Sequence, residues 1–499
     1  MNTISSIIAT LSSEEKRSFI STLKQKNKRN DTKNIQLFKL LDPINDNRKD
    51  LDIQLYGKRA KGAFHALCKR LHDNLIDFIA TKSFDSETSE EMEILKLLLA
   101  SRIFFEQKQY KIAIKTIRKA TLKAKTYDLF SILHEIYYTK IQYSHVDPDT
   151  SLDHLIKDFR NNQKLLQQEE NLNLFYANIQ DKLSQNRSNI AQTISDSLDN
   201  FDLSITNDLT FRSLFKILEI INQAANAARN FHSILSFVEE TYQQIESKEQ
   251  FTDKHLFYHI QILYYVANSY FRNKNFVTSQ EYLKRMEQQM TKQRGKYYKR
   301  FLPQLELLKA LNYNYTGQAE KAILSLENFD FNKIKDQTSY ILDLKLTLIV
   351  FYFQQSRCKE ALKLLNELHH SDTWYTEKAG IIWVIKKNLT EILLHIELDH
   401  IDIVESRVKG FRKKHRNYLK NNNEDRVLEF LSLTMSFYLH SDTINTKEFL
   451  AKIKDSLSRN NPEQEDIFTM SFYAWLKAWV LKSDLYQTTL EVVTQSNKD

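Results

Sequence analysis

The sequence contains very little glycine and proline, with 6 Gly and 4 Pro among its 499 residues. Average usage would place about 35 Gly and about 25 Pro in a chain of this length. These two residues supply the positive-φ and fixed-φ positions that tight turns, β-hairpins and α/β loops need. A large sheet protein would lack residues for its turns, whereas helical hairpins joined by short polar turns need few of them. The composition therefore predicts an all-α fold.

Cysteine is equally scarce. Cys68 and Cys358 lie far apart and form no CxxC motif, which excludes a disulfide framework and a thiolate zinc site. We expect both thiols to be small buried groups in a reducing cytosol. The N-terminus has no basic segment before its short apolar stretch, and no window reaches the ~20 apolar residues that a bilayer span needs. The sequence therefore predicts a chain that is neither secreted nor inserted in a membrane, and we expect a cytoplasmic location.

The shortage of glycine also removes most catalytic motifs. The six glycines are at positions 57, 62, 295, 317, 380 and 410, and none of them forms GxGxxG or a P-loop. The standard hydrolase, metalloprotease and kinase signatures are absent as well. His255 and His259 have the i, i+4 spacing of a metal-binding pair, but no further ligand completes a zinc motif. We therefore expect no catalytic residues, no metal and no cofactor.

Positive charge gathers near the N-terminus. Residues 1–83 contain 16 Lys and Arg against 9 Asp and Glu, and the whole chain has a formal net charge of +8, so the rest is nearly neutral. Several cations on one surface bind a polyanion by releasing counterions, although a lysine-rich composition alone also produces such an excess. A second basic stretch covers residues 409–420. The candidate polyanion contacts are Lys24, Lys26, Lys28, Arg29, Lys33, Lys58, Arg59 and Lys61.

Capping signals and helical periodicity indicate a small domain at the N-terminus. Ser12 and Glu15 have capping-box spacing, so a helix should begin near Ser13. A short helix that stops at Asp42 and a long helix over residues 51–81 follow. The pattern predicts a three-helix basic domain over residues 1–84.

The remaining chain reads as successive helix pairs. Residues 85–250 form degenerate helical repeats in this interpretation, and residues 251–499 form more regular ones. We expect the apolar stretch with Trp475 and Trp479 to cap the last hairpin, because terminal repeats need closure.

The regular pairs share a spacing of small and aromatic residues. Ala267 and Tyr270 precede a polar turn, and Ser279 opens the next helix. Equivalent positions 279, 322, 361 and 404 are 43, 39 and 43 residues apart. The pattern resembles the tetratricopeptide repeat (TPR), a helix–turn–helix unit of roughly 34 residues whose small residues let two helices approach closely. The period here is longer and variable, the turn glycine remains only at Gly317, and the repeat-ending proline is missing. A related solenoid of irregular α-hairpins is the alternative.

The TPR resemblance implies a superhelix (α-solenoid) of stacked hairpins with a concave groove for a partner. The residues that the TPR pattern directs toward this groove are Asn268, Arg272, Asn314 and Gln354. Their neighbours Leu311, Val350 and Leu393 are apolar. The resemblance therefore implies an apolar or helical partner segment rather than an acidic tail.

Three hypotheses follow for the function. The first is a cytoplasmic, non-enzymatic scaffold or adaptor that binds a protein or peptide partner in the groove of the superhelix. The alternative is a nucleic-acid-associated regulator, in which residues 1–84 contact DNA or RNA and the superhelix senses a partner. An enzyme with an unfamiliar all-α site is the third. The sequence indicates neither the identity of the partner nor the oligomeric state.

Overall fold

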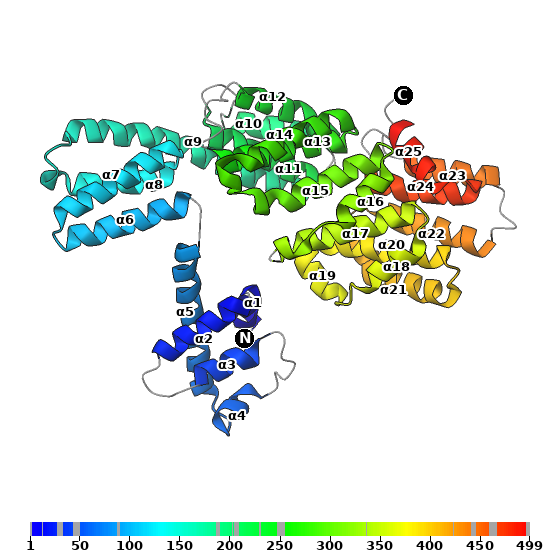
Figure 1. The fold of residues 1–499 in the computed structure, drawn as a ribbon, viewed down its shortest axis with the longest axis horizontal. Helices are drawn as coiled ribbons and strands as arrows, with labels where there is room; N and C mark the ends of the chain where they lie inside the picture. Colours follow the sequence, from blue (N-terminus) through cyan, green and yellow to red (C-terminus); the bar gives the residue numbers. More distant parts are fainter. Residues whose placement is uncertain are drawn as a thin grey trace. The chain divides into compact units, whose positions relative to one another are not determined.

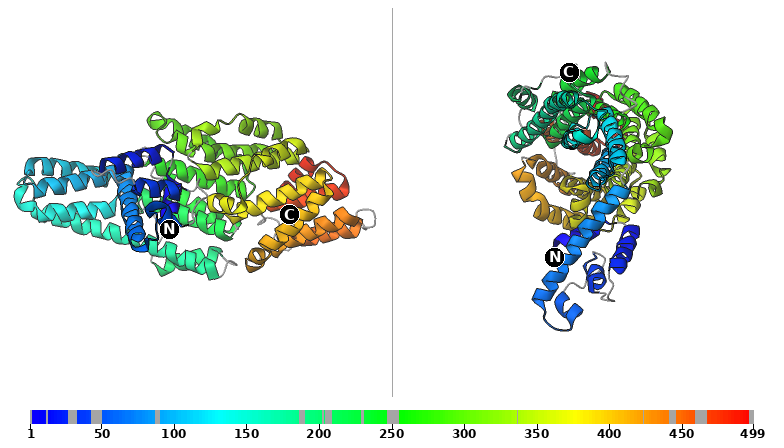
Figure 2. Two further views of the ribbon diagram at one scale, coloured as in Figure 1. Left: turned by 90° about the horizontal axis from the view of Figure 1, so that it is seen from below. Right: turned by 90° about the vertical axis from the view of Figure 1, so that its left-hand side faces the viewer.

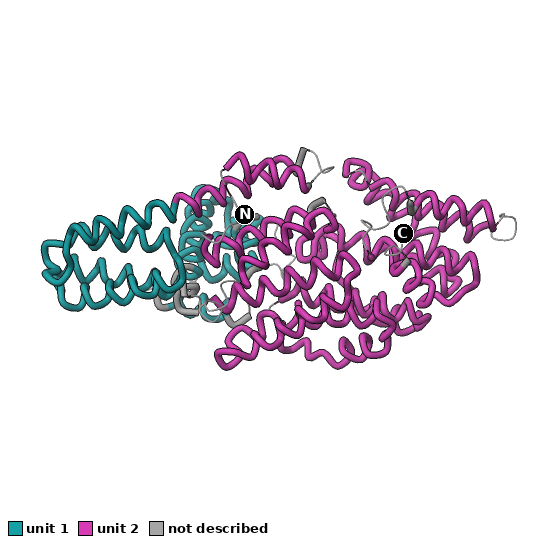
Figure 3. The backbone as a smooth tube through the Cα atoms, turned by 90° about the horizontal axis from the view of Figure 1, so that it is seen from above, with its two compact units in different colours: residues 1–166 teal, residues 167–499 magenta. Residues whose placement is uncertain are grey.

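The computed structural model confirms the all-α prediction for the residues that it describes (Figure 1). These residues are 2–11, 13–26, 33–42, 50–86, 90–185, 190–201, 203, 209–228, 231–246, 255–335, 337–422, 424–440, 446–458 and 467–495. They contain α-helices and short 3₁₀ turns, and no strand occurs among them. The chain forms two compact units, residues 1–166 and 167–499 (Figure 3).

The first unit begins with a small bundle around one phenylalanine. Its helices are α1 (Asn2–Thr10), α2 (Ser13–Lys26), α3 (Lys33–Leu41), α4 (Leu51–Tyr56) and α5 (Lys61–Ser86). The Phe19 ring is fully buried and lies 5.0 Å from the ring of Phe38 and 5.1 Å from that of Phe78. This aromatic contact joins α2, α3 and the longer α5. The two shorter helices, which would be marginal alone, are therefore stabilised by packing on α5.

This bundle differs from the predicted three helices in two places. Residues 2–10 form a helix of their own, which packs through buried Ile4 and Ile8. The helix predicted over residues 51–81 is two helices, because Gly57 adopts φ 69° and ends α4. The predicted start at Ser13 is correct. The domain boundary at residue 84 stays a prediction: α5 ends at Ser86 within a unit that continues to residue 166.

A second core in the first unit forms where alanines let helices approach. The helices are α6 (Glu90–Glu106), α7 (Tyr110–Thr126), α8 (Phe130–Gln142) and the first part of α9 (Leu152–Gln185), which continues into the second unit. Ala113, Ala120 and Ala124 of α7 are fully buried in this core. The ring of Phe105 stacks on that of Tyr143 at 4.2 Å, which ties the end of α6 to the end of α8.

The second unit is a run of helix pairs. After the last part of α9 its helices are α10 (Ile190–Asn200), α11 (Phe211–Ala228), α12 (Leu235–Glu246), α13 (Leu256–Arg272), α14 (Phe276–Gly295), α15 (Tyr298–Tyr315), α16 (Ala319–Glu327), α17 (Thr338–Gln354), α18 (Cys358–Asn366), α19 (Asp372–Ala379), α20 (Ile381–Glu397), α21 (Ile401–Asn421), α22 (Asp425–His440), α23 (Thr446–Ser458), α24 (Ile467–Leu481) and α25 (Leu485–Gln495). One continuous buried core runs through them.

A left-handed residue marks the turn of each regular hairpin. These residues are Lys274, Gly317, Ser356 and Asp399 in the second unit and Lys108 in the first. In every one of these turns the following residue donates its backbone N–H to the carbonyl five residues back, as Asn275 does to Tyr270 at 2.9 Å. This bond is the hallmark of a Schellman motif, which satisfies a carbonyl at the helix end. The turn recurs at the same intervals as the small residues, so these hairpins are TPR-like repeats.

Small residues sit where the two helices of a pair meet. Ala267, Ala310 and Ala361 are fully buried. Ser279 is also fully buried, and its hydroxyl donates to the carbonyl of Ala267 at 2.8 Å, which joins α14 to α13. Asn312 of α15 donates to the same hydroxyl at 3.1 Å. One serine therefore links three successive helices, and its hydrogen bonds offset the cost of burying it.

The last two helices pack on earlier repeats as well as on the last hairpin (Figure 2). Trp475 of α24 is 1% exposed, and its indole N–H donates to Glu397 at the end of α20 at 2.7 Å. The Tyr486 hydroxyl of α25 donates to the backbone carbonyl of Asn314 in α15 at 2.6 Å. The predicted capping stretch thus also contacts α20, and the helix that follows it, α25, contacts α15. Among the described helices, none has the length and apolarity needed to cross a bilayer.

We predict that Ala267→Leu lowers the free energy of unfolding of the second unit by about 1–3 kcal/mol. The larger side chain would force α13 and α14 apart at the point where Ser279 bonds to the Ala267 carbonyl. Urea unfolding followed by tryptophan fluorescence measures this change, because all four tryptophans lie between residues 374 and 479. Val277→Leu is the control, since Val277 is 71% exposed on α14. An equal effect of both substitutions would contradict the close approach of the two helices.

Candidate ligand-binding cavity

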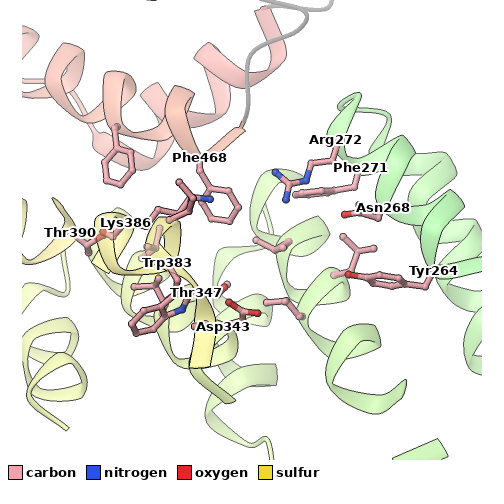
Figure 4. A pocket seen from close by; sticks show the side chains of 18 residues that line it. Tyr264, Asn268, Phe271, Arg272, Asp343, Thr347, Trp383, Lys386, Thr390 and Phe468 are labelled. Carbon is pink, nitrogen blue, oxygen red and sulfur yellow. The ribbon is translucent and has the colours of Figure 1, made fainter. Parts of the chain in front are cut away.

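The second unit contains a cavity of about 310 Å³ between the first helices of successive hairpins (Figure 4). Helices α13, α15, α17 and α20 form its walls, and α24 contributes the rings of Phe468 and Phe472. Part of the lining is aliphatic, including Leu308, Leu311 and Leu346. The cavity therefore lies where the TPR resemblance implies a groove, with the C-terminal helix as an additional wall.

Two cations of the cavity lie over one aromatic ring. The ammonium of Lys386 is 3.9 Å from the centre of the Phe468 ring, and the guanidinium of Arg272 is 5.8 Å from it. Arg272 also lies 5.3 Å from the ring of Phe231. Such cation–π contacts are worth about 0.5–2 kcal/mol each, depending on how far they are removed from water. They hold α13 and α20 to the N-terminal end of α24 and place two positive charges at the cavity.

A single carboxylate faces these cations from another wall. Asp343 of α17 points into the cavity in Figure 4. No hydrogen bond or ion pair to its carboxylate is formed by any other residue in the described part of the chain. Burial raises the pKa of Asp343 to about 6, and the Lys386 ammonium offsets part of that rise. Removal from water disfavours the charged form of an acid, which explains the direction.

The α17–α20 side of the cavity also carries polar groups. The indole N–H of Trp383 is buried without an acceptor among the described residues, and Trp383 itself is 5% exposed. Figure 4 shows Trp383 and Thr347 on the same side as Asp343. Across the cavity, burial raises the pKa of the Tyr264 hydroxyl, which therefore stays a neutral hydrogen-bond donor near neutral pH. Hydrogen-bond donors and a single carboxylate thus converge on a largely apolar space.

The four groove residues predicted from the TPR pattern separate into two pairs. Asn268 and Arg272 line the cavity. Asn314 and Gln354 do not: their exposed fractions are 0% and 3%, and the Asn314 amide donates to the Gln354 side-chain oxygen at 2.8 Å. The expected exposure of this second pair is therefore wrong. The physical reason is α25, whose Tyr486 bonds to the Asn314 carbonyl and covers this part of the groove.

The structure describes only some of the predicted polyanion contacts. Lys24 is exposed on α2, and Lys58, Arg59 and Lys61 are exposed between α4 and the start of α5. The Lys33 ammonium lies 4.3 Å from the centre of the Tyr56 ring. The side chain of Lys26 and both Lys28 and Arg29 fall outside the described residues. Contact with nucleic acid through this domain stays a prediction.

The two histidines with metal-binding spacing, His255 and His259, pack against an aromatic ring. The ring of His255 stacks on that of Phe211 at 5.3 Å, and the ring of His259 meets it edge-on at 6.2 Å. Within the described ranges, no three or more His, Cys, Asp or Glu side chains are grouped so that they could hold a metal ion.

A second, more polar cavity of about 570 Å³ lies between α18 and α21. Its charges pair with one another. Asp372 accepts from Lys414 at 2.8 Å, and Glu391 pairs with Arg407 at 2.9 Å and with Lys387 at 3.3 Å. Because these ions are already neutralised by neighbours, this cavity has less need of a charged ligand than the one around Asp343.

Sequence reasoning did not identify Asp343, Trp383, Lys386 or Phe468 as site residues. One signal was present: Asp343 interrupts one of the most apolar stretches of the chain, residues 341–353. A carboxylate inside a buried helix is rarely tolerated without a partner or a function. The contribution of Phe468 depends on the return of α24 to α13 and α20, and no local pattern indicates such a long-range contact.

The hairpins and their Schellman turns define the described part of the chain as a TPR-like helical-repeat protein. Comparison with protein-family models finds no match, and comparison with curated proteins finds none either. Among solved structures, the chain is similar to one described as "Crystal Structure of Rap Protein Complexed with Competence and Sporulation Factor". That match has 14% sequence identity and a TM-score of 0.43, and it covers 82% of this chain and 98% of the other.

We predict that Asp343→Asn stabilises the second unit above about pH 6 and leaves its stability unchanged below about pH 4. The pKa of this carboxyl rises from 3.8 to about 6 on folding. As the pH rises, the unfolded state therefore loses this proton before the folded state does. The penalty for the ionised form therefore develops as the pH rises between these two values. It reaches about 3 kcal/mol, at about 1.4 kcal/mol for each pKa unit.

Urea unfolding of both proteins at about pH 4 and about pH 7.5 measures this difference. The matched control is Asp199→Asn, because Asp199 is exposed on α10 and an exposed substitution changes stability by less than about 0.5 kcal/mol. A gain from Asp343→Asn that is the same at both pH values would show that ionisation of Asp343 is not its cause.

Proposed function

We propose that the chain is a non-enzymatic binding scaffold, and that its cavity between α13, α15, α17 and α20 holds a segment of a protein or peptide partner. The observation that carries this proposal is the composition of the cavity walls. First helices of successive TPR-like hairpins supply an aliphatic surface together with a few polar groups, and the volume of about 310 Å³ is within the range of ligand sites.

Asn268 supports a peptide-like ligand. Its carboxamide lies at the cavity and forms no hydrogen bond with another residue of the described ranges. A carboxamide offers one acceptor and two donors, so it can bond to the N–H and C=O of the same residue in an extended segment. These bonds would hold the backbone of a bound segment, so they would not depend on the segment's side chains.

Apolar contacts give such a segment its affinity. Leu307, Val350 and Ile382 line the cavity with partly exposed side chains, and a ligand side chain that covered them would gain about 25 cal/mol for each Å² removed from water. Leu393, which the TPR pattern places near the groove, is instead fully buried in the core. The aliphatic surface favours an apolar segment over an acidic tail.

The described lining of the cavity differs from that of the commonest hydrolytic sites. Among the described residues that line it, none is His, Cys or Ser, and Asp343 is the single carboxylate. The commonest hydrolytic sites use a Ser or Cys nucleophile beside a His base, or a pair of carboxylates. Binding therefore accounts for the lining better than catalysis does.

We predict that Val350→Trp lowers recovery of partners at least about tenfold in a crosslinking pull-down from the native cell, analysed by mass spectrometry with the full-length chain as bait. The indole would occupy the cavity and exclude the segment, while Val350 is only partly buried, so the helix pair can tolerate the change.

The matched control is Val277→Trp, which adds the same ring at a position 71% exposed on α14. It should leave recovery unchanged, and circular dichroism should show equal helix content for all three proteins. Partners recovered equally with the Val350 variant and the wild type would rule out this cavity as their binding site.

A further inference from the structure

Helix α7 of the first unit is strongly basic. It contains six Lys and Arg residues and no Asp or Glu. Three of these cations pair with carboxylates of the segments on either side of α7, namely Lys123 with Glu93, Lys125 with Asp158 and Arg118 with Asp147. Both flanks of the helix are therefore neutralised by the chain itself.

The other three cations form a row on the outward face of α7. Lys111, Lys115 and Lys119, here called the lysine row, occupy every fourth position, and at about 100° per residue they lie opposite the buried Ala113 and Ala120. All three are exposed, and no hydrogen bond or ion pair joins them to another residue in the described part of the chain. Like charges at this spacing repel one another. The row therefore destabilises the helix and gives the fold no contact in return.

Two large aliphatic side chains are exposed beside the lysine row. Leu122 is 69% exposed and Ile112 is 52% exposed. Leu122 follows Lys115 by two helical turns, so it lies in line with the row. A single exposed aliphatic residue is ordinary. Aliphatic side chains next to unpaired lysines, however, are typical of a surface that meets negative charge and hydrocarbon together.

We propose that the lysine row, together with Leu122 and Ile112, docks the first unit on the surface of a membrane that contains anionic lipids. The lysines bind the negatively charged head groups, and the two aliphatic side chains enter the boundary between head groups and acyl chains. This binding is peripheral and involves no membrane span. The lysine row belongs to the first unit and the cavity to the second, so the inference is independent of the proposed function.

The exposed aliphatic side chains favour a lipid surface over nucleic acid. Phosphate groups of either partner would attract the lysines. A nucleic-acid backbone offers no apolar surface to Leu122 or Ile112, whereas the acyl boundary of a bilayer does. Helix α7 also contains no Asn or Gln, the side chains that recognise adenine edges. The composition of this face therefore indicates a membrane.

The number of lysines determines the expected strength of binding. Each lysine close to an anionic surface raises the binding constant by about fivefold, so the three together contribute about 100-fold. Because this attraction falls off within a Debye length, which is about 10 Å in 0.1 M salt, binding should weaken as salt is added.

Co-sedimentation with lipid vesicles tests the proposal with the full-length protein. The probes are vesicles of phosphatidylcholine alone and vesicles in which one lipid in three is phosphatidylglycerol. We expect the protein to sediment with the anionic vesicles and not with the neutral ones. Joint replacement of the row by Lys111→Gln, Lys115→Gln and Lys119→Gln should weaken this binding about 100-fold. Leu122→Gln alone should weaken it severalfold, because it removes apolar surface and no charge.

The matched control removes three exposed lysines of the second unit, by Lys359→Gln, Lys363→Gln and Lys378→Gln. It changes the net charge of the chain by the same amount as the first triple variant, so it separates the local row from the overall charge. We expect it to bind like the wild type. Circular dichroism should show equal helix content for all variants, because every replaced side chain is exposed.

Failure of the wild type to bind anionic vesicles would overturn the inference, and so would an equal loss of binding in the two triple variants. A short duplex DNA serves as the comparison ligand. Tighter binding to the duplex than to the vesicles, unchanged by Leu122→Gln, would assign the lysine row to nucleic acid and overturn the membrane inference. None of these results would alter the expected effect of Val350→Trp on the recovery of partners.

Discussion

The hairpin turn with one left-handed residue is the constraint on which the repeat architecture depends. It reverses the chain so that the small residues of both helices face each other, and the Ser279 hydroxyl can then bond to the Ala267 carbonyl. Glycine adopts this conformation without strain, yet it occurs in only one of the five turns. Lys274, Ser356 and Asp399 adopt it at a cost of roughly 1–2 kcal/mol each. Packing of the paired helices offsets that cost, which explains how a chain with so few glycines forms regular repeats.

The C-terminal helices convert an open groove into a cavity. Trp475 and Tyr486 bond to residues that lie about 80 and 170 positions earlier in the chain. Their packing buries Asn314 and Gln354 and leaves a smaller space around Asp343. The same return of the chain brings Phe468 to Arg272 and Lys386. The return of α24 and α25 to earlier helices therefore determines both which part of the groove is closed and which charged side chains lie around the remaining space.

The predictable part of this protein is its local structure. Scarce Gly and Pro predict helices, the capping-box spacing of Ser12 and Glu15 predicts a helix start, and the recurring small residues predict the hairpin pairing, because each depends on neighbours in the sequence. Of the residues that line the cavity, the repeat pattern pointed only to Asn268 and Arg272. Asn314 and Gln354 follow it equally well, but α25 covers them, and a repeat pattern contains no information about a helix that packs back from the end of the chain. Gly57 likewise ends α4 inside a stretch with continuous helical periodicity.

Photo-crosslinking in the native cell tests the central claim most directly, namely that this cavity is where a ligand binds. A benzophenone side chain placed at position 346, on the cavity wall, reacts only with molecules within a few ångströms, and the same group at the exposed position 277 of α14 serves as the reference. The account predicts a specific adduct at position 346 that is absent at position 277. Adducts that are equal at the two positions, or present at position 277 alone, would contradict it.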